Sequence, residues 1–197
     1  ALKTAHVNLQ NTVQALSVNL QKRIEELENL RPIELKVSGE IPPIKIEGLS
    51  HPLMPDLIRI LMAGENAFLK GPASSGKTTA AKQAREVLSK AFQREDYLCK
   101  ATGAVSDSYA LIGYKNAIGE YVRTAFRDAV EHGHLFLWDE VDASADDAVL
   151  VVNSLDNGFI AFPDAEIPLH PHFRLICGGN TDGSGATMEY SGRRRMD

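Results

Sequence analysis

The glycine-rich segment GPASSGKT, from Gly71 to Thr78, has residue types and spacing suited to binding phosphate. It lies between the apolar run AFLK and an amphipathic stretch that starts at Lys77, so we expect a strand, a loop and a helix in that order. The spacing fits GxxxxGK[ST], in which glycines let the backbone wrap closely around phosphate without Cβ clashes. N–H groups of the loop and of the helix N-terminus then point at the anion. The segment therefore predicts a phosphate-binding loop.

The last two residues of this loop have separate expected roles. Lys77 should reach the β- and γ-phosphates of a nucleoside triphosphate, and the Thr78 hydroxyl should ligate Mg²⁺. We therefore predict ATP and Mg²⁺ as ligands, with Lys77 acting in catalysis as well as in binding. The predicted nucleotide-binding residues are Gly71, Pro72, Ala73, Ser74, Ser75, Gly76, Lys77, Thr78 and Thr79.

A second polar group follows the apolar run LFLW, which reads as a buried strand ending in Asp139 and Glu140. An Asp at a sheet edge beside a phosphate loop can hold the water shell of Mg²⁺, and an adjacent Glu can take a proton from the attacking water. We assign Asp139 to the metal and Glu140 to the general base. The acids that come next are expected to cap or solvate the following helix, whose N-terminal dipole favours carboxylates: Asp142, Asp146 and Asp147.

A third polar element is Asn180, which follows another apolar run, RLIC, and two glycines. A side-chain amide there could orient the lytic water between Glu140 and the γ-phosphate. Asparagine after two glycines is also typical of a turn.

These residues are set in an alternating pattern of helices and strands. Helices are expected near 55–63, 77–92, 120–132 and 145–157, and short apolar strands at 67–70, 97–101, 135–138 and 173–177. Short apolar strands between amphipathic helices predict an α/β fold with a parallel sheet covered by helices. The runs GFIAF and EIPLH around PDA predict an inserted β-hairpin.

The N-terminal part is predicted to be organised separately. Apolar residues recur every three or four positions over 5–30 and predict one long helix in a segment 1–32. It could be a coiled coil with a stutter or a docking arm packed on a neighbouring domain. Residues 33–48 alternate apolar and polar residues around two prolines, which is typical of a short β-hairpin or a linker. Residues 49–197 then form the main domain.

Charge, cysteine spacing and hydropathy argue against several kinds of site. The net charge is −5, so no overall basic field points to nucleic acid. The two cysteines are far apart in sequence, and this spacing predicts no zinc site. No apolar stretch approaches the roughly 20 residues that span a bilayer. We expect no membrane association and a cytoplasmic location.

Together, the three polar elements resemble the AAA+ ATPase family over about residues 49–197. GPASSGKT resembles its Walker A motif, LFLWDE its Walker B motif and the Asn180 strand end its sensor 1. Within the family, the chain is similar to the branch of MoxR-like, CbbQ-like and dynein-related domains. SYALIGYKNAIGEYVRTAF resembles the helix-2 insert of that branch, and GFIAFPDAEIPLHPHFRLICGGN resembles its hairpin before sensor 1.

The resemblance implies a homo-oligomeric ring, usually a hexamer, with ATP at the subunit interfaces and inserted loops that grip a substrate. The loops could equally be plain exposed connections. Candidate gripping residues are Tyr114, Lys115 and Asn116, with Pro163, Asp164 and Ala165 at the hairpin tip. The family also has an arginine finger and a helical lid after sensor 1. We expect the domain to be incomplete at its C-terminal end and the finger to lie beyond Asp197, with Arg193, Arg194 and Arg195 as lesser candidates.

The predicted function is an ATP-hydrolysing ring motor that remodels a macromolecule, with protein favoured over nucleic acid as substrate. One alternative is a monomeric P-loop kinase or nucleotide switch, against which the Asp139–Glu140 pair and Asn180 argue. Another is a scaffold that uses ATP only to assemble, against which Glu140 argues, because such a site needs no base.

Overall fold

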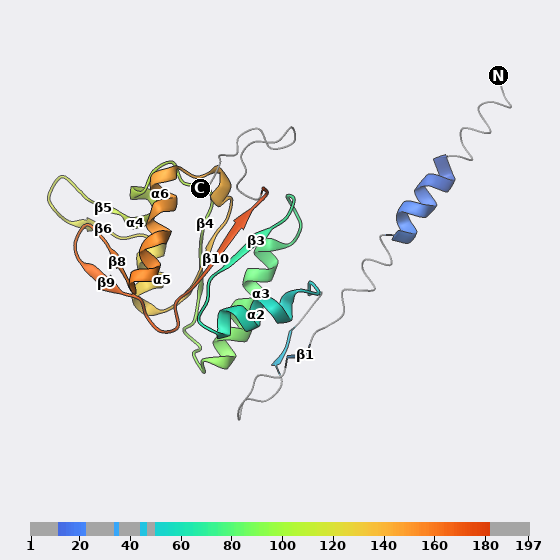
Figure 1. The fold of residues 1–197 in the computed structure, drawn as a ribbon, viewed down its shortest axis with the longest axis horizontal. Helices are drawn as coiled ribbons and strands as arrows, with labels where there is room; N and C mark the ends of the chain where they lie inside the picture. Colours follow the sequence, from blue (N-terminus) through green and yellow to red (C-terminus); the bar gives the residue numbers. More distant parts are fainter. Residues whose placement is uncertain (1–11, 23–33, 36–43, 47–49, 182–197) are drawn as a thin grey trace, which may run out of the picture.

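The computed structural model describes residues 12–22, 34–35, 44–46 and 50–181. Their largest sheet has four strands, which are all parallel (Figure 1). Its spatial order is β3 (Ala67–Lys70), β10 (Arg174–Gly179), β7 (Leu135–Trp138) and β4 (Cys99–Thr102). The predicted α/β fold with a parallel sheet is confirmed, and the carboxyl ends of all four strands meet at one edge.

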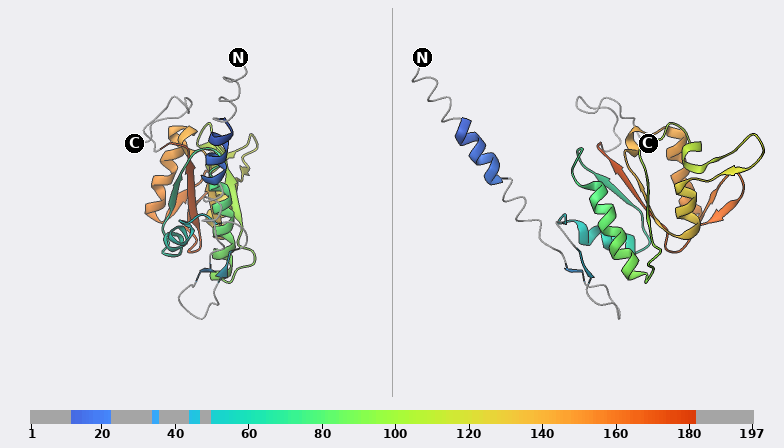
Figure 2. Two further views of the ribbon diagram at one scale, coloured as in Figure 1. Left: turned by 90° about the vertical axis from the view of Figure 1, so that its right-hand side faces the viewer. Right: turned by 180° about the vertical axis from the view of Figure 1, so that it is seen from behind.

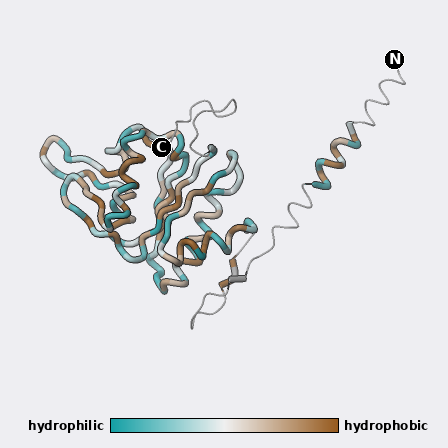
Figure 3. Tube along the Cα trace, in the orientation of Figure 1, coloured by the Kyte–Doolittle hydropathy of each residue, from teal (hydrophilic) through white to brown (hydrophobic). Residues whose placement is uncertain are grey.

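Strand β7 shows why the sheet is covered on both faces, because all four of its residues are buried. Leu135 and Leu137 pack in one hydrophobic cluster, whereas Phe136 and Trp138 pack in another. Successive side chains of a strand point to opposite faces, so a strand without polar residues needs an apolar layer on each side. The hydropathy of the chain follows this arrangement, with hydrophobic segments concentrated in the strands and the facing helices (Figure 3).

Four helices supply those layers. Helices α2 (Met54–Met62) and α3 (Lys77–Ala91) pack on one face, and α5 (Ala125–His132) and α6 (Asp146–Val152) pack on the other (Figures 1 and 2). Helix α5 has clear sequence signals at both ends. The Thr124 side chain accepts a hydrogen bond from the Arg127 N–H at its start, and Gly133 takes a left-handed φ of 68° at its end.

Two antiparallel hairpins extend the domain beside α5. The predicted hairpin is confirmed as β8 (Phe159–Ala161) and β9 (Glu166–Pro168). The second hairpin, β5 (Tyr114–Lys115) and β6 (Tyr121–Val122), lies partly where we predicted the start of a helix. That prediction was wrong for 120–124, because Asn116 closes a tight turn by accepting hydrogen bonds from the N–H groups of Ile118 and Glu120.

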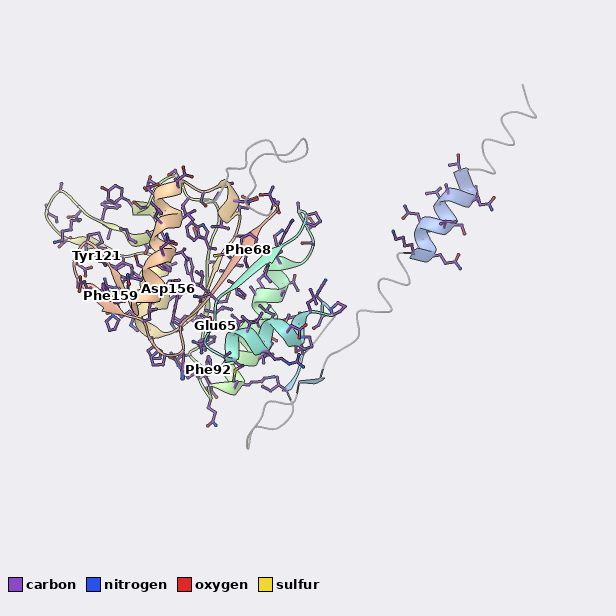
Figure 4. All side chains as sticks on the ribbon, in the orientation of Figure 1. Glu65, Phe68, Phe92, Tyr121, Asp156 and Phe159 are labelled. Atoms are coloured by element: carbon purple, nitrogen blue, oxygen red, sulfur yellow. The ribbon has the colours of Figure 1, made fainter. Side chains whose placement is uncertain are left out.

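The hairpins are tied to each other and to α5 by Arg127, which is 3% exposed. Its guanidinium pairs with Asp164 at 2.8 Å and lies 4.6 Å from the Phe162 ring centroid, both beside the turn of β8–β9. The guanidinium also lies 5.4 Å from the ring centroid of Tyr121 on β6. Figure 4 labels Tyr121 together with Phe159 of β8. Asp164 therefore forms a structural ion pair in addition to lying near the hairpin tip.

The remaining elements are short. Helix α4 (Tyr109–Ile112) precedes β5, the 3₁₀ helix η1 (Val141–Ala143) follows β7, and η2 (Asn153–Asn157) follows α6. Residues 12–22 are helical and exposed, and the rest of the predicted helix 5–30 lies outside the described residues. Strands β1 (Glu34–Leu35) and β2 (Ile44–Lys45) pair antiparallel, and Ile44 is buried in the core with Ile46. None of the described helices is long and apolar enough to cross a membrane.

Candidate nucleotide-binding site

The predicted phosphate-binding loop joins β3 to α3 at the carboxyl edge of the sheet. Gly76 has φ 89° as the residue before α3, a conformation that glycine adopts without strain. Gly76, as the N-cap residue, has no side chain to cap this helix terminus, so the first N–H groups of α3 can serve an anion. Ser74 also has a positive φ, 62°, which costs a residue with a Cβ of the order of 1 kcal/mol. The backbone strain at Ser74 thus lies within the loop that is predicted to bind phosphate.

Lys77 is held by three acceptors at the mouth of this loop. Its Nζ donates to the carbonyl oxygens of Gly71 at 2.8 Å and Pro72 at 3.1 Å. It also donates to Asn180 Oδ1 at 2.9 Å, which joins the loop to the end of β10. Two residues that are 103 positions apart in sequence therefore meet, as the predicted convergence of parallel strand ends requires.

The two predicted metal ligands are in direct contact. The Thr78 hydroxyl donates to Asp139 Oδ2 at 3.1 Å, and Asp139 Oδ1 accepts from the Glu140 N–H at 3.0 Å. Space for this carboxylate depends on Gly178 of β10, where an added Cβ would lie 2.7 Å from Asp139 Oδ1. A hydroxyl and a carboxylate side by side are oxygen ligands of the kind that Mg²⁺ prefers. The donor set fits the predicted metal.

Glu140 is exposed and has a left-handed backbone, with φ 55° and ψ 37°. A glutamate gains nothing locally from this conformation, so the surrounding structure must impose it. The Ser144 hydroxyl lies 3.4 Å from the Glu140 carbonyl and accepts hydrogen bonds from Trp138 Nε1 and from the Val105 N–H. The turn after β7 is therefore fixed by the loop that follows β4.

Asp142 was wrongly predicted to cap or solvate the next helix. It is fully buried, and its Oδ2 accepts hydrogen bonds from the N–H groups of Asn180 at 3.1 Å and Thr181 at 2.9 Å. The Thr181 hydroxyl donates to the same oxygen at 2.8 Å. Asp146 and Asp147 do lie in the first turn of α6, as predicted, and Asp147 also accepts a hydrogen bond from the Ser108 N–H. Sequence position alone did not indicate that Asp142 turns toward β10.

The converging groups border a cavity of about 450 Å³. Gly71 and Pro72 are not among its lining residues, and they contribute their carbonyls to Lys77 instead. Gly103, which follows β4, lines the cavity and was missed by sequence reasoning. Burial raises the pKa of Cys177, near the end of β10, to about 12, which keeps that thiol protonated. The lining residues are Ala73, Ser74, Ser75, Gly76, Lys77, Thr78, Thr79, Gly103, Asp139, Glu140 and Asn180.

A parallel sheet with a phosphate loop after one strand and an acidic pair after another defines the P-loop nucleoside triphosphatase fold. The carboxyl-edge site also follows the rule that ligands of open α/β sheets bind at that edge. The candidate arginines 193–195 lie outside the described residues.

The comparisons with known proteins agree with this fold. The chain is 27% identical over 158 residues to the uncharacterised protein YojN of Bacillus subtilis, covering 75% of this chain and 50% of YojN. Its structure is similar to that of NtrX from Brucella abortus, with a TM-score of 0.53, 14% identity, and coverage of 88% of this chain and 37% of NtrX. It is also similar to a Cytophaga hutchinsonii protein proposed to be an ATPase, with a TM-score of 0.51, 18% identity, and coverage of 74% and 42%.

No family model matches the chain. The chain spans about half the length of YojN and less than half of each of these structures. At such identities the structural likeness is one of fold alone.

Proposed function

We propose that the protein binds ATP with Mg²⁺ and hydrolyses it to ADP and phosphate. The observation that carries this proposal is the convergence of Lys77, Thr78, Asp139, Glu140 and Asn180 on one cavity from three different strand ends. A phosphate loop alone would support binding. A carboxylate base and an amide at the same cavity support attack by water as well.

Each side chain has a distinct part in the proposed reaction. Lys77 neutralises charge on the transferred phosphoryl group. Asn180, whose side-chain oxygen accepts a hydrogen bond from Lys77 in this structure, orients the attacking water. Glu140 is exposed at the cavity and takes a proton from that water. Thr78 and Asp139 would hold Mg²⁺, which would supply Lewis-acid stabilisation of the phosphate oxygens.

We further propose that the protein is a motor of the MoxR-like branch that acts as a homo-oligomeric ring, usually a hexamer, in the cytoplasm on a protein substrate. The two hairpins support this part, because they form a paired projection beyond α5, on the side of the domain opposite β3 (Figure 1). Tyr114 is 48% exposed and lies with Lys115 and Pro163 around a surface hollow, where a polypeptide could be gripped. Asn116 shapes the turn of β5–β6, and Asp164 is engaged with Arg127.

Replacing the proposed base tests hydrolysis and assembly together. Glu140→Gln should lower ATP turnover at least about 100-fold while ATP binding is kept, because only proton transfer is removed. Light scattering of this variant with ATP-Mg²⁺ should show growth to a discrete oligomer near six subunits. Glu95→Gln, at an exposed site in the loop after α3, is the matched control and should behave as wild type.

Other outcomes would favour the alternatives. A species that binds ATP and stays monomeric would overturn the ring and favour a kinase or nucleotide switch. Assembly with ATP and no turnover in the wild type would favour a scaffold. Transfer of phosphate to an acceptor other than water would identify a kinase.

A further inference from the structure

We propose that Asp142 is a positioning residue, whose buried carboxylate fixes Asn180 relative to Glu140. This inference rests on the proposed ATP hydrolysis and deepens it. Asp142 lies outside the cavity lining, so it acts through its neighbours rather than on the nucleotide. Its position in sequence, two residues after Glu140, places it in the turn η1 directly behind the proposed base.

The first argument is the direction of its hydrogen bonds. Asp142 Oδ2 receives the N–H of Asn180, the N–H of Thr181 and the Thr181 hydroxyl, all within 3.1 Å. These donors belong to the segment where β10 ends, which is where Asn180 turns toward Lys77. One carboxylate oxygen therefore fixes the backbone on which the water-orienting amide is mounted.

The second argument is that η1 is held from the opposite side as well. Ser144, one residue beyond η1, accepts hydrogen bonds from Trp138 Nε1 and the Val105 N–H, both at 3.1 Å. Ser144 is 2% exposed, so these two hydrogen bonds are shielded from competition by water. Asp142 is hydrogen-bonded to the residues that follow β10, and Ser144 is hydrogen-bonded to β7 and to the loop after β4. These bonds on both sides of η1 hold the strained backbone of Glu140 in place.

The third argument is energetic. A carboxylate without solvent exposure is costly unless it is hydrogen-bonded, and a charged acceptor makes stronger bonds than a neutral one. A carboxylate that only capped a helix at the surface would not need to be buried. Burying the Asp142 carboxylate is worth its free-energy cost if it fixes the distance between Glu140 and Asn180, because small displacements of reacting groups slow catalysis strongly.

The test compares turnover per bound nucleotide in the full-length chain. Asp142→Ala should lower kcat about 100-fold, with the dissociation constant for mant-ATP close to that of the wild type. Asp142→Asn should be intermediate, because its amide oxygen can still accept the two N–H groups. Asp156→Asn, at the exposed residue of η2 labelled in Figure 4, is the control and should leave kcat unchanged.

A second pair of variants covers the case in which Asp142→Ala fails to fold. Thr181→Val removes only the hydroxyl that donates to Asp142 and should lower kcat about tenfold, whereas Thr181→Ser should restore it. A merely structural role would reduce thermal stability and the fraction of protein that binds mant-ATP, with wild-type kcat per binding site.

The outcomes separate the two proposals. Wild-type kcat per site in both Asp142→Asn and Thr181→Val would overturn the positioning role and leave ATP hydrolysis standing. A wild-type protein that binds mant-ATP without turnover would overturn ATP hydrolysis, and the positioning role with it. Loss of kcat with rescue by Thr181→Ser would establish both.

Discussion

The two ends of the sheet each carry a cation that donates to backbone carbonyls, and the two cations have different consequences. At the carboxyl end, Lys77 donates to Gly71 and Pro72 and borders an open cavity. At the amino end, Arg174 is 7% exposed and donates to the carbonyls of Leu61, Pro171 and Phe173. Hydrogen bonds beside a cavity can be exchanged for bonds to a ligand, whereas those of Arg174 can only support the fold.

The histidines extend this contrast at the amino end. The His172 ring stacks on Phe92, with centroids 4.2 Å apart, and the His172 N–H donates to His170 Nδ1. His134 Nδ1 accepts from the Leu98 N–H. Ionisable residues therefore gather at this end as well, but here they are engaged in packing and in hydrogen bonds to the backbone. A cluster of polar groups does not by itself indicate a ligand-binding site. Polar groups that converge on an open cavity do indicate one.

The largest expected effect is on nucleotide binding. Lys77→Ala should weaken mant-ATP binding about 100-fold, because the loop loses its only lysine at the phosphate position. Its unfolding temperature should stay near that of the wild type. Lys82→Ala, at an exposed position of α3, is the control. A large loss of stability in Lys77→Ala would remove the contrast between the two ends.

Replacing the other cation should have the opposite profile. Arg174→Met should lower the free energy of unfolding by about 2 kcal/mol, because buried carbonyls lose their donors. Urea denaturation measures this, and mant-ATP affinity of the folded protein should be unchanged. Arg59→Met removes an exposed ion pair with Asp56 and should cost little. Weakened nucleotide binding in Arg174→Met would show that the ends are coupled.

A smaller effect is expected from the metal contact. Gly178→Ala should raise the Mg²⁺ concentration for half-maximal turnover about tenfold, because its Cβ would displace the Asp139 carboxylate. Gly179→Ala, one residue further on, would meet the ring of Phe68, which is 45% exposed and can move aside, and the Thr181 carbonyl at 3.3 Å, but not the Asp139 carboxylate. Equal Mg²⁺ dependence in the two variants would contradict the placement of Asp139.

The smallest effect should come from pH, and it belongs to the amino end. Burial, with a further contribution from Arg94, lowers the pKa of His134, His170 and His172 below the ordinary histidine value of 6.5. The unfolded chain then binds more protons than the native state, so stability is full above pH 6.5 and declines as the pH falls through the native pKa values. Asp96 and Asp128 oppose the shift of His134, and Arg174 adds to that of His172.

Thermal unfolding measured at about pH 7.5 and about pH 5.5 should reveal this loss before carboxylates titrate. His172→Phe keeps the stacking on Phe92 and removes one titrating group, so it should reduce the pH dependence. An unfolding temperature that does not change between the two conditions would contradict the burial of these rings.

The sequence predicted the carboxyl end of the sheet better than the rest of the molecule. Lys77, Asp139 and Asn180 could be found because each follows an apolar strand at its carboxyl end, where parallel strands bring their side chains together. The strand order could not be predicted, since β10 is inserted between β3 and β7 by long-range packing. The role of Asp142 was hidden for the same reason, because its partners lie 38 and 39 positions away.

Local pattern also misled in two places. The first is the segment 120–124 before α5, which was predicted as helix. Tyr121 in this segment belongs to the β5–β6 hairpin and packs against the buried Arg127. A hairpin and a helix here would both present apolar residues to the same core, so the apolar pattern did not distinguish them. The predicted helix 145–157 changes to a 3₁₀ helix at Asn153. Tertiary contacts override local preference at such short elements.

The place of β10 in the sheet has a consequence for how the chain matures on the ribosome. Strand β3, at residues 67–70, has no neighbour in the four-stranded sheet until residues 174–179 emerge, and β7 is paired only with β4 until then. Until then the strand that leads into the phosphate loop is not paired with the strands that lead to the acidic pair, although α3 can already pack on β7. Because β10 is the last of these four strands in sequence, the phosphate loop and the acidic pair come to one sheet edge only when it pairs with both β3 and β7.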